Sequence, residues 1–337
     1  MTGTTATIGW GILAPGKISA LFATDLAVVP GGRLVHVGSR TPERAAAFAG
    51  RHGAERYGDY ESVLADPEVD VVYIGSPHVA HAAHVVQALE AGKHVLCEKP
   101  LALDRATAEH LFATARAHDR FLMEAMWSAC NPVWRDLARR LRAGELGTPR
   151  HLSAEFHFTA PADPTHRLLD PALGGGAMHD IGLYPLTFAH LMLGEAVELR
   201  AVGTVVDRYV DLDVAISGCY PGDTYATLTA GLTSQSANGA RITTDTGWVE
   251  VPGDFHSPTS FTFNGLAKRG QPVERVVHRP AEPVLGAGYG NEIAHVHECL
   301  RAGLRESPWV PPAQTLTILG QIEDIRVQIG ASPHPAA

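Results

Sequence analysis

Lysine is scarce in this chain: only four of its 27 basic residues are lysine, at positions 17, 93, 99 and 268. The formal net charge is −9, and the absence of basic runs argues against nucleic acids and anionic membranes as partners. Arginine cannot readily lose its proton and carries a bulky planar fork, so a lysine here indicates a position where arginine would fail. We expect a small-molecule substrate, no nucleic acid and no membrane.

Cysteine and long apolar runs are also scarce. The four cysteines form no C-x-x-C pair, which favours reduced thiols over a disulfide framework or a zinc ribbon. No apolar run reaches the ~18 residues of a membrane span, and no export signal is evident, so we expect a cytoplasmic protein. His78, His81 and His84 recur every third residue, but this spacing spreads them around a helix, and we expect no metal site.

A chain of 337 residues exceeds what one hydrophobic core usually serves, so we expect two domains, residues 1–126 and 127–337. In the first, apolar runs alternate with helical patterns, which predicts an α/β fold with a doubly wound parallel sheet. Its strands are expected at 7–13, 33–39, 70–75, 93–100 and 121–125.

The second domain has a different pattern, in which short strands of alternating polarity are separated by turns. Such strands are expected at 152–158, 201–206, 215–220, 225–232, 241–244, 248–251 and 260–263. They predict an α+β domain with a large, mainly antiparallel sheet. The helices that we can assign cover one face of this sheet, so we expect its open face to form a homodimer.

The turn after the first strand carries a weak dinucleotide fingerprint. The letters of Gly9-x-Gly11-x-x-Ala14 fit G-x-G-x-x-A, but these glycines would lie inside the strand, out of reach of a phosphate. We prefer the stretch Ala14-Pro15-Gly16-Lys17-Ile18-Ser19 at the end of the strand. There Gly16 would let a pyrophosphate approach the backbone N–H groups of the next helix.

The end of the second strand bears on cofactor choice. A site for NAD would have an acidic residue here for the ribose 2′-hydroxyl, whereas this chain has Ser39-Arg40-Thr41. A guanidinium flanked by hydroxyls suits a 2′-phosphate, because arginine binds phosphate through a fork of charge-assisted donors. We therefore expect NADP rather than NAD. The alternative is an exposed surface arginine.

Two further strands end in candidate site residues. Ser76-Pro77 ends the strand at 70–75, at the carboxyl edge where ligands of open α/β sheets bind. His81, in the first turn of the following helix, is expected to point back toward this edge. The next strand ends in Glu98-Lys99-Pro100.

A glycine loop near the middle of the chain introduces Asp180 and Tyr184. The three glycines at 174–176 would allow a ligand to approach closely, and the apolar spacing up to Gly194 predicts a helix after them. Asp180 and Tyr184 would then share one helix face. They are either an acid/base pair or a buried tyrosine whose hydroxyl is satisfied by the aspartate.

The order and spacing of these motifs resemble the Gfo/Idh/MocA family of NAD(P)-dependent oxidoreductases. The resemblance rests on the near-fingerprint, Ser76-Pro77-x-x-x-His81, Glu98-Lys99-Pro100 and Gly174-Gly175-Gly176-x-x-x-Asp180-Ile181-Gly182-x-Tyr184. Tyr184 and Glu124-Ala125-Met126-Trp127 are similar to the branch of dimeric dihydrodiol dehydrogenases and NADP-dependent D-xylose dehydrogenases. Ala129 and His78 depart from that branch, which usually has Arg and Asn there.

The resemblance implies a Rossmann domain, an open-faced second domain and roles for single residues. Tyr184 would be the general acid/base, Lys99 would contact the nicotinamide ribose and the substrate hydroxyl, and Asp180 would orient the substrate or Lys99. We expect the cofactor site to comprise Ala14, Pro15, Gly16, Lys17, Ile18, Ser39, Arg40, Ser76, Pro77, His81, Glu98, Lys99 and Trp127.

We therefore predict an NADP-dependent oxidoreductase that moves hydride between nicotinamide and a hydroxyl-bearing carbon of a sugar, polyol or cyclic trans-diol. One alternative is a member of the same family that retains its cofactor while it modifies a sugar. The other is a dinucleotide-binding regulator without turnover. Such a regulator would need no proton-transfer pair.

Overall fold

The computed structural model describes residues 7–266 and 273–333. The chain forms two compact units: unit 1 comprises Met1–Cys130 and Val284–Leu316, and unit 2 comprises Asn131–Pro283 and Thr317–Ala337. Unit 1 is therefore discontinuous in sequence, because the chain returns to it with helix α8 (Tyr289–Arg301) and leaves it again within helix α9 (Pro312–Gln328). The functional division at residues 126 and 127 stays a prediction.

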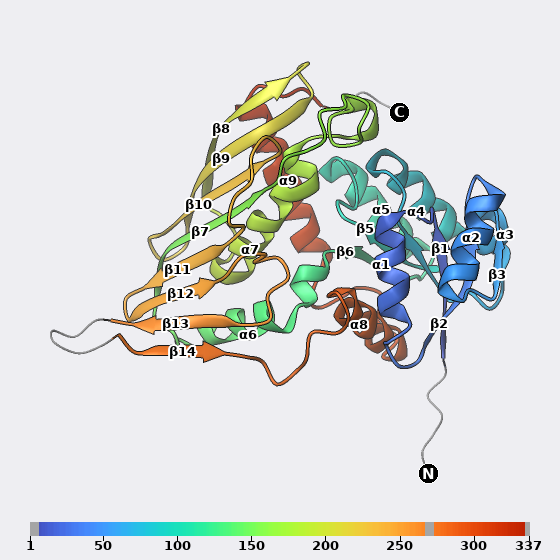
Figure 1. The fold of residues 1–337 in the computed structure, drawn as a ribbon, viewed down its shortest axis with the longest axis horizontal. Helices are drawn as coiled ribbons and strands as arrows, with labels where there is room; N and C mark the ends of the chain where they lie inside the picture. Colours follow the sequence, from blue (N-terminus) through green and yellow to red (C-terminus); the bar gives the residue numbers. More distant parts are fainter. Residues whose placement is uncertain (1–6, 267–272, 334–337) are drawn as a thin grey trace, which may run out of the picture. The chain divides into compact units, whose positions relative to one another are not determined.

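Unit 1 contains a six-stranded sheet in the order β3-β2-β1-β4-β5-β6 (Figure 1). The strands are β1 (Ile8–Leu13), β2 (Gly32–Gly38), β3 (Arg56–Gly58), β4 (Val71–Ile74), β5 (His94–Glu98) and β6 (Leu122–Ala125). All five pairings are parallel, which confirms the predicted doubly wound sheet. The strand order reverses between β1 and β4, the switch point at which such sheets bind ligands.

Five helices connect these strands: α1 (Lys17–Leu26), α2 (Pro42–His52), α3 (Tyr60–Ala65), α4 (His81–Glu90) and α5 (Arg105–Ala117). The β1 strand is packed tightly, since Trp10 contacts Phe22 of α1 edge-on and Phe22 stacks on Tyr73 of β4 at 3.8 Å between ring centroids. A Cβ atom on Gly9 would lie 2.0 Å from the Glu68 carbonyl oxygen. Gly9 lies inside β1, as expected. Its lack of a side chain allows the Glu68 backbone to pack closely against the strand.

Unit 2 contains an eight-stranded sheet in the order β14-β13-β12-β11-β7-β10-β9-β8. The strands are β7 (Pro149–His157), β8 (Glu198–Val206), β9 (Val210–Tyr220), β10 (Thr224–Gly231), β11 (Ala240–Thr244), β12 (Gly247–Val251), β13 (Phe261–Gly265) and β14 (Arg275–His278). Only the β7–β10 pairing is parallel, so the mainly antiparallel sheet is confirmed. The β14 strand was not predicted, because its side chains are mostly exposed and show no buried alternation.

Helices cover one face of this sheet. The α7 helix (Leu183–Leu193) packs on β7 and β10, and α6 (Pro132–Arg142) packs on α7 (Figure 1). On the opposite face Val202 and Tyr225 are 72% and 55% exposed. In the described part of the chain, every helix is too short or too polar to cross a membrane.

Candidate functional site

The turn between β1 and α1 is shaped for an anion. Ala14 has a left-handed backbone with φ of 65°, and its N–H donates to the Gly38 carbonyl at 3.1 Å. The Ser19 hydroxyl donates to the Ala14 carbonyl at 2.8 Å, so the serine that replaces the third glycine closes the turn. Gly16 begins the helix, and a Cβ atom there would meet nothing nearer than 4.0 Å. The first N–H groups of α1 therefore face an open surface that a pyrophosphate fits.

Ser39 and Arg40 follow β2 at the same edge of the sheet. Ser39 is buried and its hydroxyl accepts a hydrogen bond from the Thr41 N–H at 3.1 Å, whereas Arg40 is exposed. Burial, together with the charge of Arg40, lowers the pKa of His84. Because Nδ1 of His84 lies 2.9 Å from the Ser76 hydroxyl, the guanidinium stands near the end of β4. The exposed Arg40 can therefore contact a 2′-phosphate more readily than the buried Ser39 can.

His81 points toward the carboxyl edge of the sheet, as expected. Its side chain is fully buried, with one ring nitrogen 2.8 Å from the Pro100 carbonyl oxygen and the other 2.8 Å from that of Ser76. Burial lowers the pKa of His81 to about 4, and the two carbonyl oxygens oppose this change. The ring lies against the loops that carry Ser76 and Pro100, and its part in cofactor binding stays a prediction. The exposed Pro77 lies beside it.

Lys99 follows β5 between two buried carboxyl groups. Glu98 accepts hydrogen bonds from the Tyr73 hydroxyl at 2.5 Å and from the Lys99 N–H at 3.2 Å. Glu124, at the end of β6, accepts from the Leu101 N–H and the Thr315 hydroxyl. Burial raises the pKa of Glu124, and the charge of Lys99 opposes the change. The sequence motif that contains Glu124 gave this residue no role. Its position at the carboxyl end of a strand could have indicated a site residue.

Trp127 lies in the short helix η2 (Trp127–Cys130) and is buried. Its ring stacks on Tyr289 of α8 with 5.1 Å between centroids. Tyr289 was missed because it is more than 150 residues away in the sequence. The expected cofactor residues thus gather in unit 1, at the carboxyl ends of β1, β2, β4, β5 and β6.

Glu292 of α8 gives unit 1 a pH-dependent stability. The side chain is fully buried, and neither carboxyl oxygen has a hydrogen-bond partner among the described residues. Burial, reinforced by the charges of Glu98 and Asp25, raises the pKa of Glu292 well above the 4.5 of an unburied glutamate. The Glu292 carboxyl group therefore stays protonated in the folded protein at pH values at which it is ionised in the unfolded chain. Its contribution to the free energy of unfolding is fully present at low pH and declines as the pH rises.

We expect Glu292→Gln to remove this decline, since the amide keeps the shape and does not titrate. From this one group the wild type should lose up to about 1.4 kcal/mol of unfolding free energy per pH unit between the unfolded and the raised folded pKa. Urea unfolding at pH 5, 6.5 and 8 measures the difference between the two proteins. A difference that is constant across the three values would contradict the prediction.

In unit 2, the segment that carries Asp180 is not the α-helix that the sequence predicts. Met178–Gly182 is a π-helix, and it continues into α7 at Leu183. A π-helix bonds residue i to i+5, so its turn is wider than that of an α-helix. Asp180 and Tyr184 are both buried, and their position on one helix face stays a prediction.

Asp180 and Tyr184 each have a neighbour that sequence reasoning missed. The Arg167 guanidinium donates to the Asp180 carboxylate at 2.9 Å, and its side chain is 50% exposed. The Tyr184 ring lies 5.3 Å from the Phe156 ring and 5.5 Å from the His256 ring, and these two rings stack on each other. Arg167 and His256 lie in irregular loops, where no periodicity identifies a site.

The predicted residues thus form two groups. Unit 1 holds the open turn of α1, the exposed Arg40 and the half-buried Lys99. In unit 2, Asp180 lies beside the Arg167 guanidinium and Tyr184 lies beside the His256 ring. The first group can bind a dinucleotide, and the second can exchange a proton with a hydroxyl group.

Known protein families match the chain in both of its units. Residues 4–126 match the model of an oxidoreductase family with an NAD-binding Rossmann fold, and residues 134–250 match the GFO/IDH/MocA C-terminal domain. The chain is 34% identical over 328 residues to trans-1,2-dihydrobenzene-1,2-diol dehydrogenase of Xenopus tropicalis, covering 96% of this chain and 98% of the relative. The human protein of the same name is 35% identical over 335 residues, covering 96% and 97%.

Solved structures give the same result. A 3-ketoreductase from Actinomadura kijaniata, in complex with NADP and TDP-benzene, has a TM-score of 0.83 at 30% identity and covers 96% of this chain and 98% of its own. An aldose-aldose oxidoreductase from Caulobacter crescentus, complexed with glycerol, has a TM-score of 0.85 at 27% identity, covering 96% and 97%. With a Rossmann fold, an open-faced second sheet and relatives that match nearly end to end, this chain belongs to the Gfo/Idh/MocA family of oxidoreductases.

Proposed function

We propose that this protein is an NADP-dependent dehydrogenase that moves hydride between nicotinamide and a carbinol carbon of a sugar, polyol or cyclic trans-diol. The observation that carries the proposal is the position of Lys99, which follows β5 at the same sheet edge as the open turn of α1. A compact cation at this edge suits both a ribose and a substrate hydroxyl. The relatives named as diol dehydrogenases and the neighbour bound to NADP support it.

The dinucleotide would be held by unit 1. Residues 14–18 would receive its pyrophosphate, Arg40 its 2′-phosphate, and Ser76, Pro77, Glu98, Lys99 and Trp127 the nicotinamide half, while His81 shapes the loop of Ser76. The bound cofactor supplies the hydride acceptor. The chain itself must then remove the hydroxyl proton, and we assign that step to Tyr184, with Lys99 stabilising the alkoxide as it forms. Asp180, held by Arg167, would orient the substrate.

A panel of aldoses, polyols and trans-dihydrodiols assayed with NADP⁺ tests this function. We expect absorbance of NADPH to rise with at least one compound. A protein that binds NADP⁺ and reduces none of it with the whole panel would contradict the proposal. Tightly bound cofactor that survives gel filtration would instead favour the cofactor-retaining alternative.

Cofactor preference gives a sharper test. We expect Arg40→Ala to raise the KM for NADP⁺ by one to two decades, because it removes a charge-assisted contact of about 1.5–3 kcal/mol. The KM for NAD⁺ should change little, since NAD⁺ has no 2′-phosphate. Arg51→Ala, in the last turn of α2, is the matched control. Equal changes for the two cofactors would show that Arg40 does not bind the phosphate.

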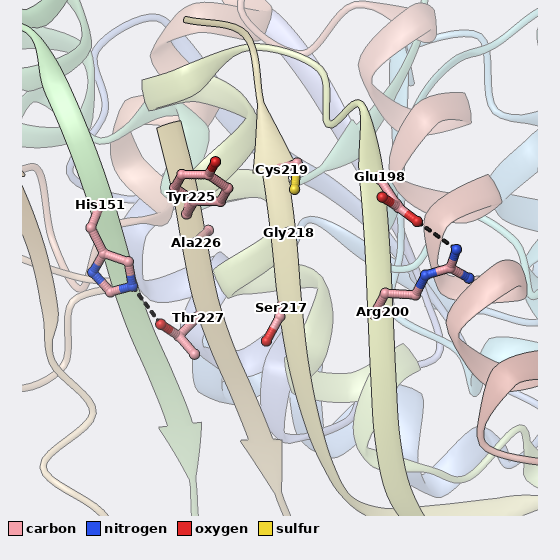
Figure 2. Close-up of a pocket in the computed structure, with 9 residues that line it drawn as sticks. All are labelled: His151, Glu198, Arg200, Ser217, Gly218, Cys219, Tyr225, Ala226 and Thr227. Carbon is pink, nitrogen blue, oxygen red and sulfur yellow. Dashed lines mark hydrogen bonds and ion pairs between the residues drawn. The ribbon is translucent and has the colours of Figure 1, made fainter. Parts of the chain in front are cut away.

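We further propose that the open face of the unit 2 sheet forms a homodimer in the cytoplasm. Figure 2 shows a hollow on this face that crosses the four neighbouring strands β7, β10, β9 and β8. Within it, His151 pairs with Thr227 and Glu198 pairs with Arg200. The row Val202, Ala215 and Thr229 crosses three strands in register. A face with paired polar groups and exposed apolar side chains suits a self-complementary interface. The four free thiols suit a reducing compartment.

Assembly is measured by sedimentation. The wild type should sediment at twice the chain mass of 35.9 kDa, and Ala215→Arg should sediment as a monomer because each subunit would then place an arginine in the proposed interface. A wild-type monomer at micromolar concentration would rule out the dimer.

A further inference from the structure

A buried ion pair lies directly behind the glycine loop of unit 2. Asp211 of β9 is fully buried, and Arg326 of α9 is 4% exposed. The Arg326 guanidinium donates to Asp211 Oδ1, and it also donates to the carbonyls of Tyr209 at 2.7 Å and Ser332 at 3.0 Å. The arginine is therefore fixed by three partners, and it holds the carboxylate in one place.

The second oxygen of Asp211 reaches the catalytic segment. Oδ2 accepts a hydrogen bond from the Met178 N–H at 2.6 Å, and Met178 is the first residue of the π-helix. A carboxylate that accepts from a backbone N–H is among the stronger hydrogen bonds in proteins. Met178 is two residues before Asp180 and six before Tyr184. The carboxylate thus anchors the start of the element on which both side chains stand.

The glycines of the loop fit this arrangement. Gly176 has φ of 135°, and a Cβ atom there would lie 2.6 Å from Asp211 Oδ1. A Cβ atom on Gly175 would lie 2.7 Å from the Leu168 carbonyl oxygen. Gly175 and Gly176 therefore make room for the protein's own oxygen atoms, whereas the sequence suggested that they make room for a ligand.

We propose that Asp211 is a positioning residue, fixed by Arg326, that sets the place of Asp180 and Tyr184 by holding the first turn of the π-helix. A fully buried ion pair is seldom a net source of stability, since packed apolar side chains would serve as well. A role in placing a catalytic element accounts for the pair and for Gly176 together. The inference rests on the proposed function for the roles of Asp180 and Tyr184, and on contacts within unit 2 for the rest.

The test compares Asp211→Asn with Asp213→Asn by hydrogen exchange and kinetics. Asp213 lies on the same strand but accepts from the Thr233 hydroxyl, so it is a matched control. In Asp211→Asn we expect amides of residues 177–184 to exchange about tenfold faster or more. We expect kcat to fall by about tenfold or more while the KM for NADP⁺ stays within about twofold, because misplacing a catalytic group lowers turnover without affecting cofactor binding. Asp213→Asn should change none of these quantities.

Removing the carboxylate alone leaves Arg326 buried without its partner and can prevent folding. The double variant Asp211→Asn with Arg326→Met avoids this, and it should still show the faster exchange at 177–184. Unchanged exchange in a folded variant would overturn the proposal, as would exchange that rises equally over the whole of unit 2. Hydrogen exchange does not depend on a substrate. If Asp211→Asn exchanges faster at 177–184 and the wild type shows no turnover, the proposed function is refuted and the positioning role of Asp211 is not.

Discussion

Tyr184→Phe is expected to lower kcat by about 10²-fold or more, the range for a lost general acid/base. Oxidation of an alcohol needs a base for the hydroxyl proton, and a free phenol with a pKa near 10 is too weakly ionised at neutral pH to serve well. A nearby ammonium favours the phenolate, and we assign that task to Lys99. The dissociation constant for NADP⁺ should be almost unchanged, because phenylalanine keeps the ring and removes only the hydroxyl group.

The pH profile adds a second readout for the same variant. The alkaline rise of kcat should disappear in Tyr184→Phe and remain in Tyr57→Phe, a change at an exposed tyrosine of β3. Near wild-type turnover in Tyr184→Phe would show that another group takes the proton. The neighbouring His256 would then be the next candidate, since His81 is buried and braces loops.

Lys99→Met is expected to lower kcat by about 10²–10³-fold, as for the loss of a group that stabilises developing negative charge. Lys99→Arg should restore little of this, because the bulky planar guanidinium does not place a compact charge at the same point. Lys17→Met is the informative contrast. Lys17 begins α1 and is exposed, so its loss should raise the KM for NADP⁺ and leave kcat almost unchanged.

The alternative role for Lys99 is that of a ribose or phosphate anchor. In that case Lys99→Met would resemble Lys17→Met, with a raised KM and an unchanged kcat. Steady-state kinetics of the two variants side by side separate the two roles. Identical behaviour of the pair would remove Lys99 from the chemistry.

The parts of the fold that the sequence predicts well are those set by local patterns. Parallel strands buried on both faces give continuous apolar runs such as β4, which the chain repeats between helices, so five of the six strands were predictable. The three-residue edge strand β3 was missed, because its side chains are partly or fully exposed and form no apolar run. The register of the first turn was also predictable, because Gly9 and Gly11 lie inside β1. The start of α6 is also set by a local contact, since the Asn131 side chain accepts from the Val133 N–H.

The parts that failed depend on contacts between distant residues. Asp211, which accepts from the N–H of Met178 at the start of the π-helix, lies 33 residues further along the chain, and no local spacing reveals this contact. The contact of the His81 ring with the Pro100 carbonyl was likewise not predicted, because the two residues are 19 apart in the sequence. The role of Lys93 could not be predicted from the rarity of lysine either. Its ammonium donates to the carbonyls of Asp66 and Val69 and so stabilises the fold.

Transfer of deuterium tests the central claim most directly. The protein is incubated with NADPH that carries deuterium at the transferable C4 position, together with carbonyl forms of the sugar, polyol and diol panel. Mass spectrometry then measures the masses of the products. Our account predicts that one product gains a single deuterium at its carbinol carbon, and that Tyr184→Phe slows this gain by about 10²-fold. Products without deuterium, or a rate that is the same in the variant, would contradict it.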